Sequence, residues 1–326
     1  MAAPAIRSPR PDIVSLGVVI SHLAFTYLPV ALAAASAPGP ILLLYWFWFG
    51  IAKNGLINLM HEAAHALVFR NVAANEFLGR WVLAPLVITE FGNYRERHWE
   101  HHAELGTAKD PKLVYRTDIR GLRLGGLVIR CFLGIEALKR LTEKPPGQQE
   151  KVVVKRATLS LPLTLTQAAF FAIIAGIAIA THATWGQRAL ATGLAYGGVY
   201  AYGLSSLTVL AAALRALGEH QDGNDPQCAM RGNAALRNLR CNALTRLFLG
   251  AYGFEHHATH HLRPAVPYYH LPELTAALGK DDPTLVARTG YLTVIALLAT
   301  QAPEASWSAH QRPAAHPAIQ GRSGSA

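Results

Sequence analysis

Three long stretches without a charged side chain constrain this chain more than any other feature. Residues 13–52, 157–187 and 189–214 contain no Asp, Glu, Lys or Arg. A helix needs about 20 apolar residues to cross a bilayer, so each stretch is long enough for at least one span. Only 15% of the residues are charged, whereas soluble domains usually carry about 25%. The sequence therefore predicts an integral membrane protein.

Turn residues divide these stretches into four expected spans. Pro38-Gly39-Pro40 interrupts the first stretch, because this combination favours a turn over a helix. We expect spans at about residues 13–36, 41–60, 158–180 and 189–214. The predicted fold class is an all-α integral membrane protein, with four transmembrane helices arranged as two hairpins beneath a cytoplasmic helical cap that carries the histidines described below.

We expect a single membrane domain over residues 13–300. It follows a cytoplasmic N-terminal segment, residues 1–12, and precedes a Pro/Ala/Ser-rich tail, residues 301–326, whose composition is typical of disorder. Two weaker apolar segments complete the domain. Residues 77–91 are too short to span and predict a re-entrant or interfacial piece. Residues 121–140 mix apolar and basic side chains at helical spacing, which predicts one helix lying on the membrane surface.

The basic residues are distributed unevenly along the chain. Of the 30 Lys and Arg, 16 fall between residues 61 and 157 and 10 follow residue 214, whereas the connections at residues 37–40 and 181–187 carry none. This asymmetry is the positive-inside pattern and predicts that both termini and the middle loop are cytoplasmic, as in a multi-pass protein of a bacterial inner membrane. Contact with membrane lipid explains the formal charge of +10 more simply than nucleic acid, which we do not expect as a partner.

Histidines form the most specific pattern in the sequence. Ten of the 15 histidines fall into four short clusters on the predicted cytoplasmic side. The clusters are His61 and His65; His98, His101 and His102; His220; and His256, His257, His260 and His261.

The spacing within the clusters suits metal binding. Residues three or four apart share a face of a helix, and a neutral imidazole is a good ligand for Zn, Cu, Fe or Ni. Eight converging imidazoles exceed what one tetrahedral ion can use, so we expect two metal ions. Soluble di-iron bundles repeat a Glu-x-x-His pair on two helices. Here only Glu62 and His65 form such a pair at the relevant places, so a different type of site is indicated.

The order HExxH at residues 61–65, HxxHH at 98–102 and HxxHH at 257–261 resembles the histidine boxes of the membrane fatty acid desaturase and hydroxylase superfamily. The placement of the boxes after the second and fourth expected spans is also similar. The segment His260-His261-Leu262-Arg263-Pro264, followed by Pro267-Tyr268-Tyr269 and Leu271-Pro272-Glu273, looks like the acyl-lipid desaturase branch. The resemblance covers roughly residues 40–280.

The resemblance implies an enzyme with a non-haem centre of two iron ions that uses O₂ to introduce a double bond into a fatty acyl chain of a lipid. The sequence has no CxxC segment of the kind that a fused rubredoxin-like domain would carry. A separate electron donor of the ferredoxin, rubredoxin or cytochrome type is therefore implied. Carried over by motif position, the iron ligands are His61, His65, His98, His101, His102, His257, His260 and His261, with His220 matching an additional histidine after the fourth span.

The sequence departs from the family pattern in two places. Its HExxH box has one residue fewer between the histidines than many acyl desaturases, and His256 is an extra histidine that we interpret as a bystander. Four carboxylates are candidates to orient ligand histidines through their outer nitrogens. We favour Glu62 and Glu219 over Glu100 and Asp110, and ordinary surface carboxylates remain the alternative.

Two other functions fit parts of the pattern. A hydroxylase or ketolase of the same superfamily, acting on a lipid or another hydrophobic substrate, would share the first hydrogen abstraction with a desaturase. An intramembrane zinc protease would use HExxH with the glutamate as general base. That interpretation leaves both HxxHH motifs unexplained, and the third and fourth spans hold no Asp to complete its site.

Overall fold

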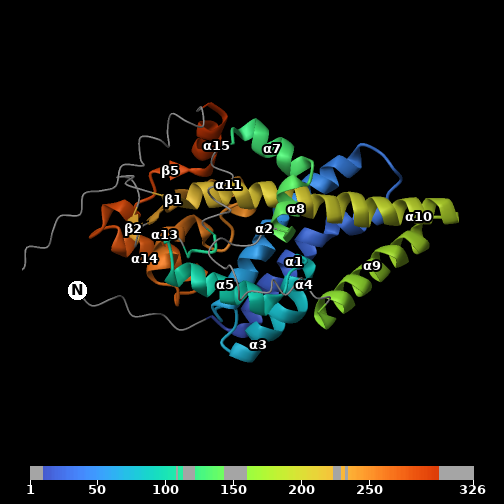
Figure 1. Cartoon of the computed structure of the whole chain (residues 1–326). Helices are drawn as coiled ribbons and strands as arrows, with labels where there is room; N and C mark the ends of the chain where they lie inside the picture. The colour runs from blue at the N-terminus through green and yellow to red at the C-terminus, as the bar shows by residue number, and fades with distance from the viewer. Residues whose placement is uncertain are drawn as a thin grey trace, which may run out of the picture.

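The computed structural model describes residues 10–107, 109–112, 122–142, 160–222, 229–231 and 234–300. Within these ranges the protein is mostly helical, and five short strands accompany the helices (Figure 1). The tail that we expect to be disordered, residues 301–326, lies outside the described residues.

Within the described ranges, three helices are long and apolar enough to cross a membrane: Asp12–Ala35, Leu161–Thr181 and Trp185–Glu219. The protein is therefore a membrane protein, as the uncharged stretches predict. The first of these helices is α1 (Asp12–Ala35). The second is α9 (Leu161–Thr181), which begins where the Ser160 side chain accepts a hydrogen bond from the Leu163 amide.

The third apolar helix is longer than the expected span. It combines α10 (Trp185–Gly193), η2 (Leu194–Ala201), η3 (Leu204–Thr208) and α11 (Val209–Glu219), where η2 and η3 are π-helical. The helix begins at a capping box between Thr184 and Gln187. The capping box provides hydrogen-bond partners for amide groups that have none within the first turn. The helix ends at Glu219, directly before a strand.

The helix α2 (Ile41–Ala64) follows α1 after a short turn and packs along it. It is less apolar than the three candidate spans because its second half holds several polar side chains. Those side chains are nevertheless buried, with exposed fractions of 3% or less: Lys53, Asn54, Asn58, His61 and Glu62. α1, η2 and η3 pack against α2, so its polar groups are covered by protein.

The segment between α2 and the second histidine box is bent. It comprises α3 (Val72–Phe77), η1 (Leu78–Leu83), α4 (Ala84–Leu86) and α5 (Phe91–Ala103). The axes on either side of residues 87–90 differ by 100°. The Glu90 carboxylate caps α5 by accepting hydrogen bonds from the amides of Gly92 and Asn93. This geometry agrees with a re-entrant or interfacial piece over residues 77–91.

The prediction of a single surface helix over residues 121–140 is wrong in detail. The structure has two helices there, α7 (Leu124–Phe132) and α8 (Ile135–Thr142). The chain breaks between them at Gly134, whose φ of +71° is readily adopted by glycine alone. Ile129, Leu133 and Leu138 are all at least 60% exposed, so the pair still presents an apolar surface.

The part of the chain after α11 contains strands that the all-α prediction does not include. β1 (His220–Asp222), β3 (Ala234–Leu236) and β2 (Ala229–Arg231) form an antiparallel sheet in that order, with His220 opposite Leu236. β4 (Leu239–Arg240) pairs in parallel with β5 (Thr289–Gly290). The strands are two or three residues long, and β1 begins at His220.

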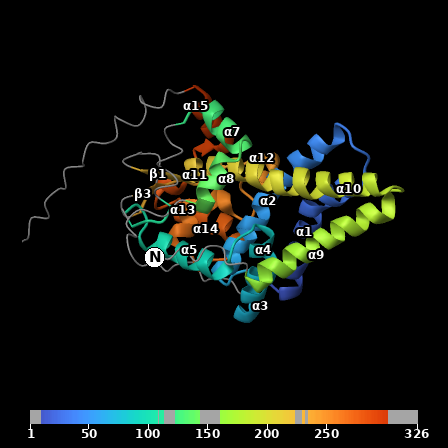
Figure 2. The same ribbon diagram turned by 45° about the vertical axis from the view of Figure 1, so that its right-hand side comes forward.

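Short helices separate these strands and follow them. They are α12 (Ala243–Phe248), η4 (Phe254–His256), α13 (His257–Leu262), η5 (Tyr268–His270), α14 (Leu271–Leu278), η6 (Pro283–Leu285) and α15 (Tyr291–Thr300). In both ribbon views α13 and α14 lie at the end of the molecule that holds α5, whereas α9 and α10 extend away from it (Figures 1 and 2).

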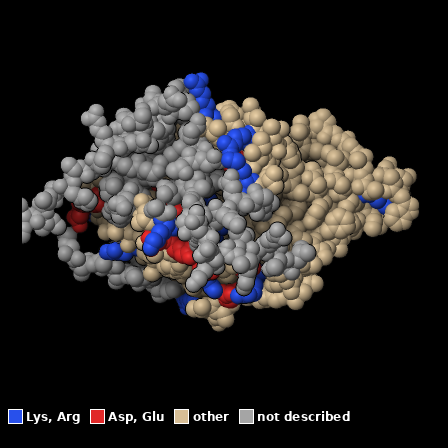
Figure 3. Space-filling view, in the orientation of Figure 1, with Lys and Arg blue, Asp and Glu red and all other residues tan. Residues whose placement is uncertain are grey.

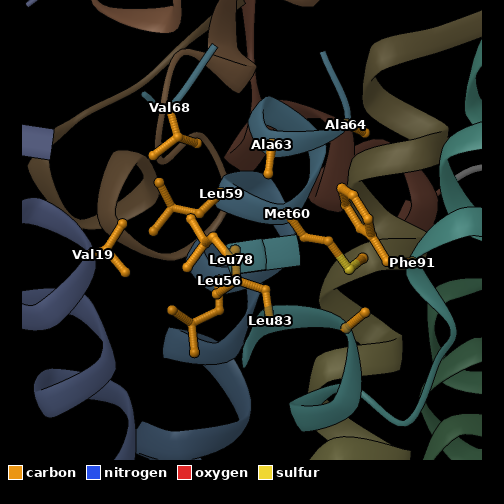
Figure 4. Packing of buried hydrophobic residues seen from close by; sticks show 11 residues of the cluster. Val19, Leu56, Leu59, Met60, Ala63, Ala64, Val68, Leu78, Leu83 and Phe91 are labelled. Atoms are coloured by element: carbon orange, nitrogen blue, oxygen red, sulfur yellow. The ribbon is translucent and has the colours of Figure 1, made fainter. Parts of the chain in front are cut away.

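A hydrophobic core joins the first two histidine boxes. Leu56, Leu59 and Met60 of α2 pack with Leu83 of η1 and Phe91 of α5 (Figure 4). The Phe91 ring lies so close to Gly79 that a Cβ there would collide with it. This packing fixes α2 and α5 against each other and so sets the relative positions of the histidines that they carry.

Charged side chains lie mainly in one half of the visible face. In the space-filling view, Lys, Arg, Asp and Glu gather over the part that includes α5, and the half formed by α9 and α10 shows almost none (Figure 3). This separation fits an apolar part that sits in lipid and a polar part that carries the histidines.

Candidate metal centre

The structure brings all nine predicted ligand histidines together in two groups. Cluster one contains His61, His65, His98, His102 and His260. Cluster two contains His101, His220, His257 and His261. Within each cluster, one nitrogen from every ring lies within 4.8 Å of those of the other members, so each cluster could hold one metal ion.

Helix geometry explains how the two HxxHH boxes divide between the clusters. On α5, His98 and His102 are four residues apart and share a face, so both reach cluster one, and His101 is directed to cluster two. On α13 the arrangement is reversed. His257 and His261 are four residues apart and share a face, and both reach cluster two. Its third histidine, His260, belongs to cluster one. Each box therefore contributes to both clusters.

The ring nitrogens are spaced as ligands of a common ion would be. In cluster one, His98 Nε2 lies 2.7 Å from His65 Nε2 and 3.1 Å from His102 Nε2. In cluster two, His257 Nε2 lies 2.7 Å from His220 Nε2 and 3.1 Å from His261 Nε2. Two imidazole nitrogens that bind one ion at 2.0–2.1 Å are roughly 3 Å apart when they are adjacent. The observed separations fit this arrangement.

His61 supplies a further indication of a metal. Its Nε2 atom is buried and has no hydrogen-bond partner in the described part of the chain. A buried polar atom without a partner is unfavourable, and a metal ion at cluster one would satisfy it. The two clusters adjoin one another, since the rings of His102 and His261 are stacked with centroids 4.2 Å apart.

Burial keeps the histidines in the neutral form that binds metals. It lowers the pKa of His65 to about 4, with a smaller effect from Lys112, and the pKa of His102 to about 2, with a smaller effect from His65. Burial also places the pKa values of His98, His257 and His260 well below the ordinary value. Because a protonated imidazole cannot bind a metal, this environment favours metal binding at neutral pH.

Three carboxylates lie next to outer nitrogens of these histidines. His101 Nδ1 is 2.8 Å from Asp110 Oδ1, and His61 Nδ1 is 3.3 Å from Glu62 Oε1. The contact between His257 Nδ1 and Glu219 Oε2 is longer, at 3.9 Å.

The contact distances do not follow the order of preference that the sequence suggests for these carboxylates. Asp110 makes the shortest of the three contacts, although the sequence favours Glu62 and Glu219. Glu100 is half-buried on α5 and forms no hydrogen bond with a histidine within the described ranges.

Sequence reasoning misses a buried polar network around Glu219. Arg215 Nε donates to Glu219 Oε1 over 3.0 Å, and the Tyr291 hydroxyl donates to the same oxygen over 2.7 Å. Arg215 also donates to Asn58 Oδ1, and its guanidinium lies 3.9 Å from the centre of the Phe254 ring. One signal is available in the sequence, since Arg215 is the first charged residue after the fourth span and stands four residues before Glu219.

Three further histidines in the described ranges have partners outside both clusters. His256 is adjacent to cluster two in sequence, but its Nδ1 is 3.0 Å from Thr275 Oγ1. His22 and His182 each place Nε2 3.1 Å from a backbone carbonyl oxygen, of Ala52 and Ala34 respectively. These contacts agree with structural roles.

Comparison with known proteins assigns the family. The model of the fatty acid desaturase family matches residues 38–292. The chain belongs to this family. The match includes every histidine of both clusters, and membership makes the protein an oxidoreductase of the membrane desaturase and hydroxylase superfamily. No curated protein matches this member of the desaturase family.

Proposed function

We propose that the protein is an O₂-dependent membrane desaturase that introduces a double bond into a fatty acyl chain of a lipid. The observation that carries the proposal is the gathering of nine histidines, from separate segments of the chain, into two adjacent clusters. Family membership gives the reaction class, and the clusters supply the place where it would occur.

Two iron ions are the proposed cofactor, one held by the five histidines of cluster one and one by the four of cluster two. Imidazole suits iron, and five ligands at one site are more than a tetrahedral zinc ion uses. When bound, the two iron ions would supply the redox chemistry that activates O₂ and breaks unactivated C–H bonds.

The residues around the clusters orient the ligands. Asp110, Glu62 and Glu219 lie beside the Nδ1 atoms of His101, His61 and His257. A carboxylate that accepts the Nδ1 proton fixes the tautomer in which Nε2 is free to bind. We assign this positioning role to Asp110 and Glu62. Glu219, at 3.9 Å from His257 Nδ1, is too distant to accept a hydrogen bond from it.

Arg215 acts on Glu219, which lies beside His257. It forms an ion pair with Glu219, and both side chains are buried. A buried charge is costly unless an opposite charge compensates it. The guanidinium compensates the Glu219 carboxylate and holds it in place behind His257.

The proposed topology uses α2 as a fourth span beside the three apolar helices, with the clusters and both termini on the cytoplasmic side of a bacterial inner membrane. The packing of α1, η2 and η3 around α2 and the distribution of Lys and Arg support this arrangement. Two electrons per turnover would come from a separate ferredoxin, rubredoxin or cytochrome.

The contacts of Glu62 argue against a zinc protease. In an HExxH protease the glutamate acts as general base on a metal-bound water. Here one oxygen of Glu62 lies beside His61 Nδ1 and the other accepts a hydrogen bond from the Tyr268 amide over 3.2 Å. The glutamate therefore lies behind the ligand and is already engaged on both oxygens.

Lipid analysis tests the proposed reaction. The protein and its His102→Ala and His261→Ala variants are expressed in a bacterial host, and fatty acids from whole lipid are analysed by gas chromatography and mass spectrometry. We expect new double bonds with the wild type and none with either variant, while all three proteins are found in the membrane fraction at similar levels. Hydroxylated acyl chains would assign the sister reaction of the superfamily, and wild-type products from either variant would contradict the site.

A further inference from the structure

Cluster one is largely closed to solvent, and a tryptophan lies between it and the surface. His61, His65, His98 and His260 are each 8% exposed or less, so a partner protein cannot touch most of the cluster directly. The fifth member, His102, is half-buried.

Trp99 of α5 contacts the cluster and is itself 44% exposed. Its ring meets His65 edge-on with centroids 4.7 Å apart. The same ring lies 5.8 Å from that of His102, the member of the cluster nearest to solvent. One side chain therefore touches two metal-binding candidates and also presents a large apolar surface outward.

The other described aromatic neighbours of cluster one do not offer the same connection. Phe254, which contacts His61, is only 8% exposed. Tyr94, which stacks on His98, is half-buried. Trp99 is therefore the aromatic side chain that joins the exposed surface to the cluster. A large exposed tryptophan is also among the residue types most often found at the energetic centre of protein contacts.

We infer that Trp99 is where the electron donor docks and the group through which electrons pass to cluster one. This inference rests on the proposed function, because that reaction needs electrons from outside. A desaturation converts –CH₂–CH₂–, O₂, two electrons and two protons into –CH=CH– and two waters. Each donor molecule loses one electron and the metal centre gains it, so two docking events supply one turnover, and Trp99 itself is unchanged.

The charge of the surrounding sequence favours an acidic donor. The side chain of Arg95, one helical turn before Trp99, is 40% exposed and pairs with Glu76. Arg97 and Lys109 are exposed, as is Glu96. In the segment that follows α5, the described residues 109–112 and 122–142 contain six Lys and Arg against two Asp and Glu. Opposite charges speed the encounter of two proteins and make it sensitive to salt. The partner that this surface fits is a small, acidic carrier of single electrons with an iron–sulfur centre.

Trp99→Leu tests the route without removing a metal ligand. The iron-loaded, detergent-purified protein is reduced without O₂ or substrate, either by a reduced [2Fe–2S] ferredoxin or by dithionite with methyl viologen, a small reductant that needs no docking surface. The rate of iron reduction is followed by absorbance in a stopped-flow instrument. We expect Trp99→Leu to slow reduction by ferredoxin at least about tenfold, with unchanged iron content and unchanged reduction by methyl viologen.

Two further variants control for packing and for the loss of any exposed tryptophan. Trp99→Phe keeps an aromatic ring against His65 and is expected to retain most of the ferredoxin rate. Trp185→Leu removes a tryptophan that is 76% exposed at the start of α10, far from α5 in both ribbon views (Figures 1 and 2), and is expected to have no effect. The wild-type ferredoxin rate is also expected to fall as NaCl is raised.

Several outcomes would overturn the inference. They are an unchanged ferredoxin rate in Trp99→Leu, an equal loss of rate with methyl viologen, or a wild type that methyl viologen reduces and ferredoxin does not. Loss of iron from both Trp99 variants would instead identify Trp99 as a cover for the cluster and would also overturn the route. Failure of the proposed function is distinct, because it would appear as a wild type that binds no iron, or as hydroxylated acyl chains in the lipid analysis.

Discussion

The Nδ1 atom of His101 lies 2.8 Å from the Oδ1 atom of Asp110, and both side chains are fully buried. Asp110 comes from the loop after α5, and its carboxylate also accepts hydrogen bonds from the amides of Gly106 and Lys112. One carboxylate thus holds both the loop and a histidine of cluster two in place.

We predict that Asp110→Asn weakens metal binding at cluster two by about 10- to 100-fold, the usual effect of losing a carboxylate behind a ligand histidine. The Gly106 and Lys112 amides donate to different oxygens of Asp110, so asparagine can accept from only one of them and the loop should lose one hydrogen bond while keeping the other. Competition with a chelator measures the affinity. Glu104→Gln, in the same loop, is the matched control and should bind metal like the wild type. Equal affinities for Asp110→Asn and the wild type would remove Asp110 from the site.

Neighbouring histidines offer a second test. His256 and His257 are adjacent in sequence, but only His257 belongs to cluster two. We predict that His257→Ala loses about one bound metal ion per chain, because it removes one of four ligands, while His256→Ala keeps the wild-type content. Elemental analysis of the two purified variants distinguishes them. Loss of metal from His256→Ala alone would mean that the ligand set is shifted by one residue.

The ion pair between Arg215 and Glu219 should stabilise the fold only as a pair. Both side chains are buried, and removing one partner of a buried pair costs about 3–5 kcal/mol because a charge is left uncompensated. We predict a marked fall in the apparent melting temperature for Arg215→Met. The double variant Arg215→Met with Glu219→Gln should recover much of that loss. A double variant less stable than Arg215→Met would show that the pair is not coupled in this way.

The contact between α1 and α2 depends on a glycine. A Cβ at Gly55 would collide with the imidazole of His22, so we predict that Gly55→Ala destabilises the protein by about 1–3 kcal/mol through overpacking. A Cβ at Gly176 in α9 would meet no atom within 4 Å, and Gly176→Ala should be neutral or slightly stabilising. Thermal unfolding in detergent compares the two. Equal melting temperatures would indicate that α1 can move away from α2 without loss.

The site can be predicted from the sequence further than the fold around it. Histidine spacing identifies eight of the nine clustered residues, because residues three or four apart on a helix share a face whatever the helix packs against. The ninth, His220, is indicated only by the resemblance to the family. The sequence does not show which boxes meet at each cluster, since that depends on how α2, α5 and α13 pack. The sequence ranks Asp110 below Glu62 and Glu219 because Asp110 lies in a loop. The position of a loop side chain does not follow the periodicity of a helix.

Residues distant in sequence account for most of what sequence reasoning misses. Asn58, Arg215 and Tyr291 come from three different helices and meet only in the folded protein. The polar half of α2 shows the same limit. The sequence predicts a span over residues 41–60, but only tertiary packing shows that the polar side chains within it are covered. In the surface segment, Gly134 breaks the expected single helix through its positive φ.

Iron content per chain is the most direct test of whether the two histidine clusters hold two iron ions. The wild type, His65→Ala from cluster one and His257→Ala from cluster two are purified in detergent after growth with iron, and iron and zinc are measured together. Two separate clusters predict about two irons per wild-type chain and about one in His257→Ala. His65→Ala should retain between one and two, because cluster one keeps four of its five histidines. A single zinc ion per chain, unaffected by His257→Ala, would contradict a two-iron centre and would favour a zinc protease that uses the HExxH motif.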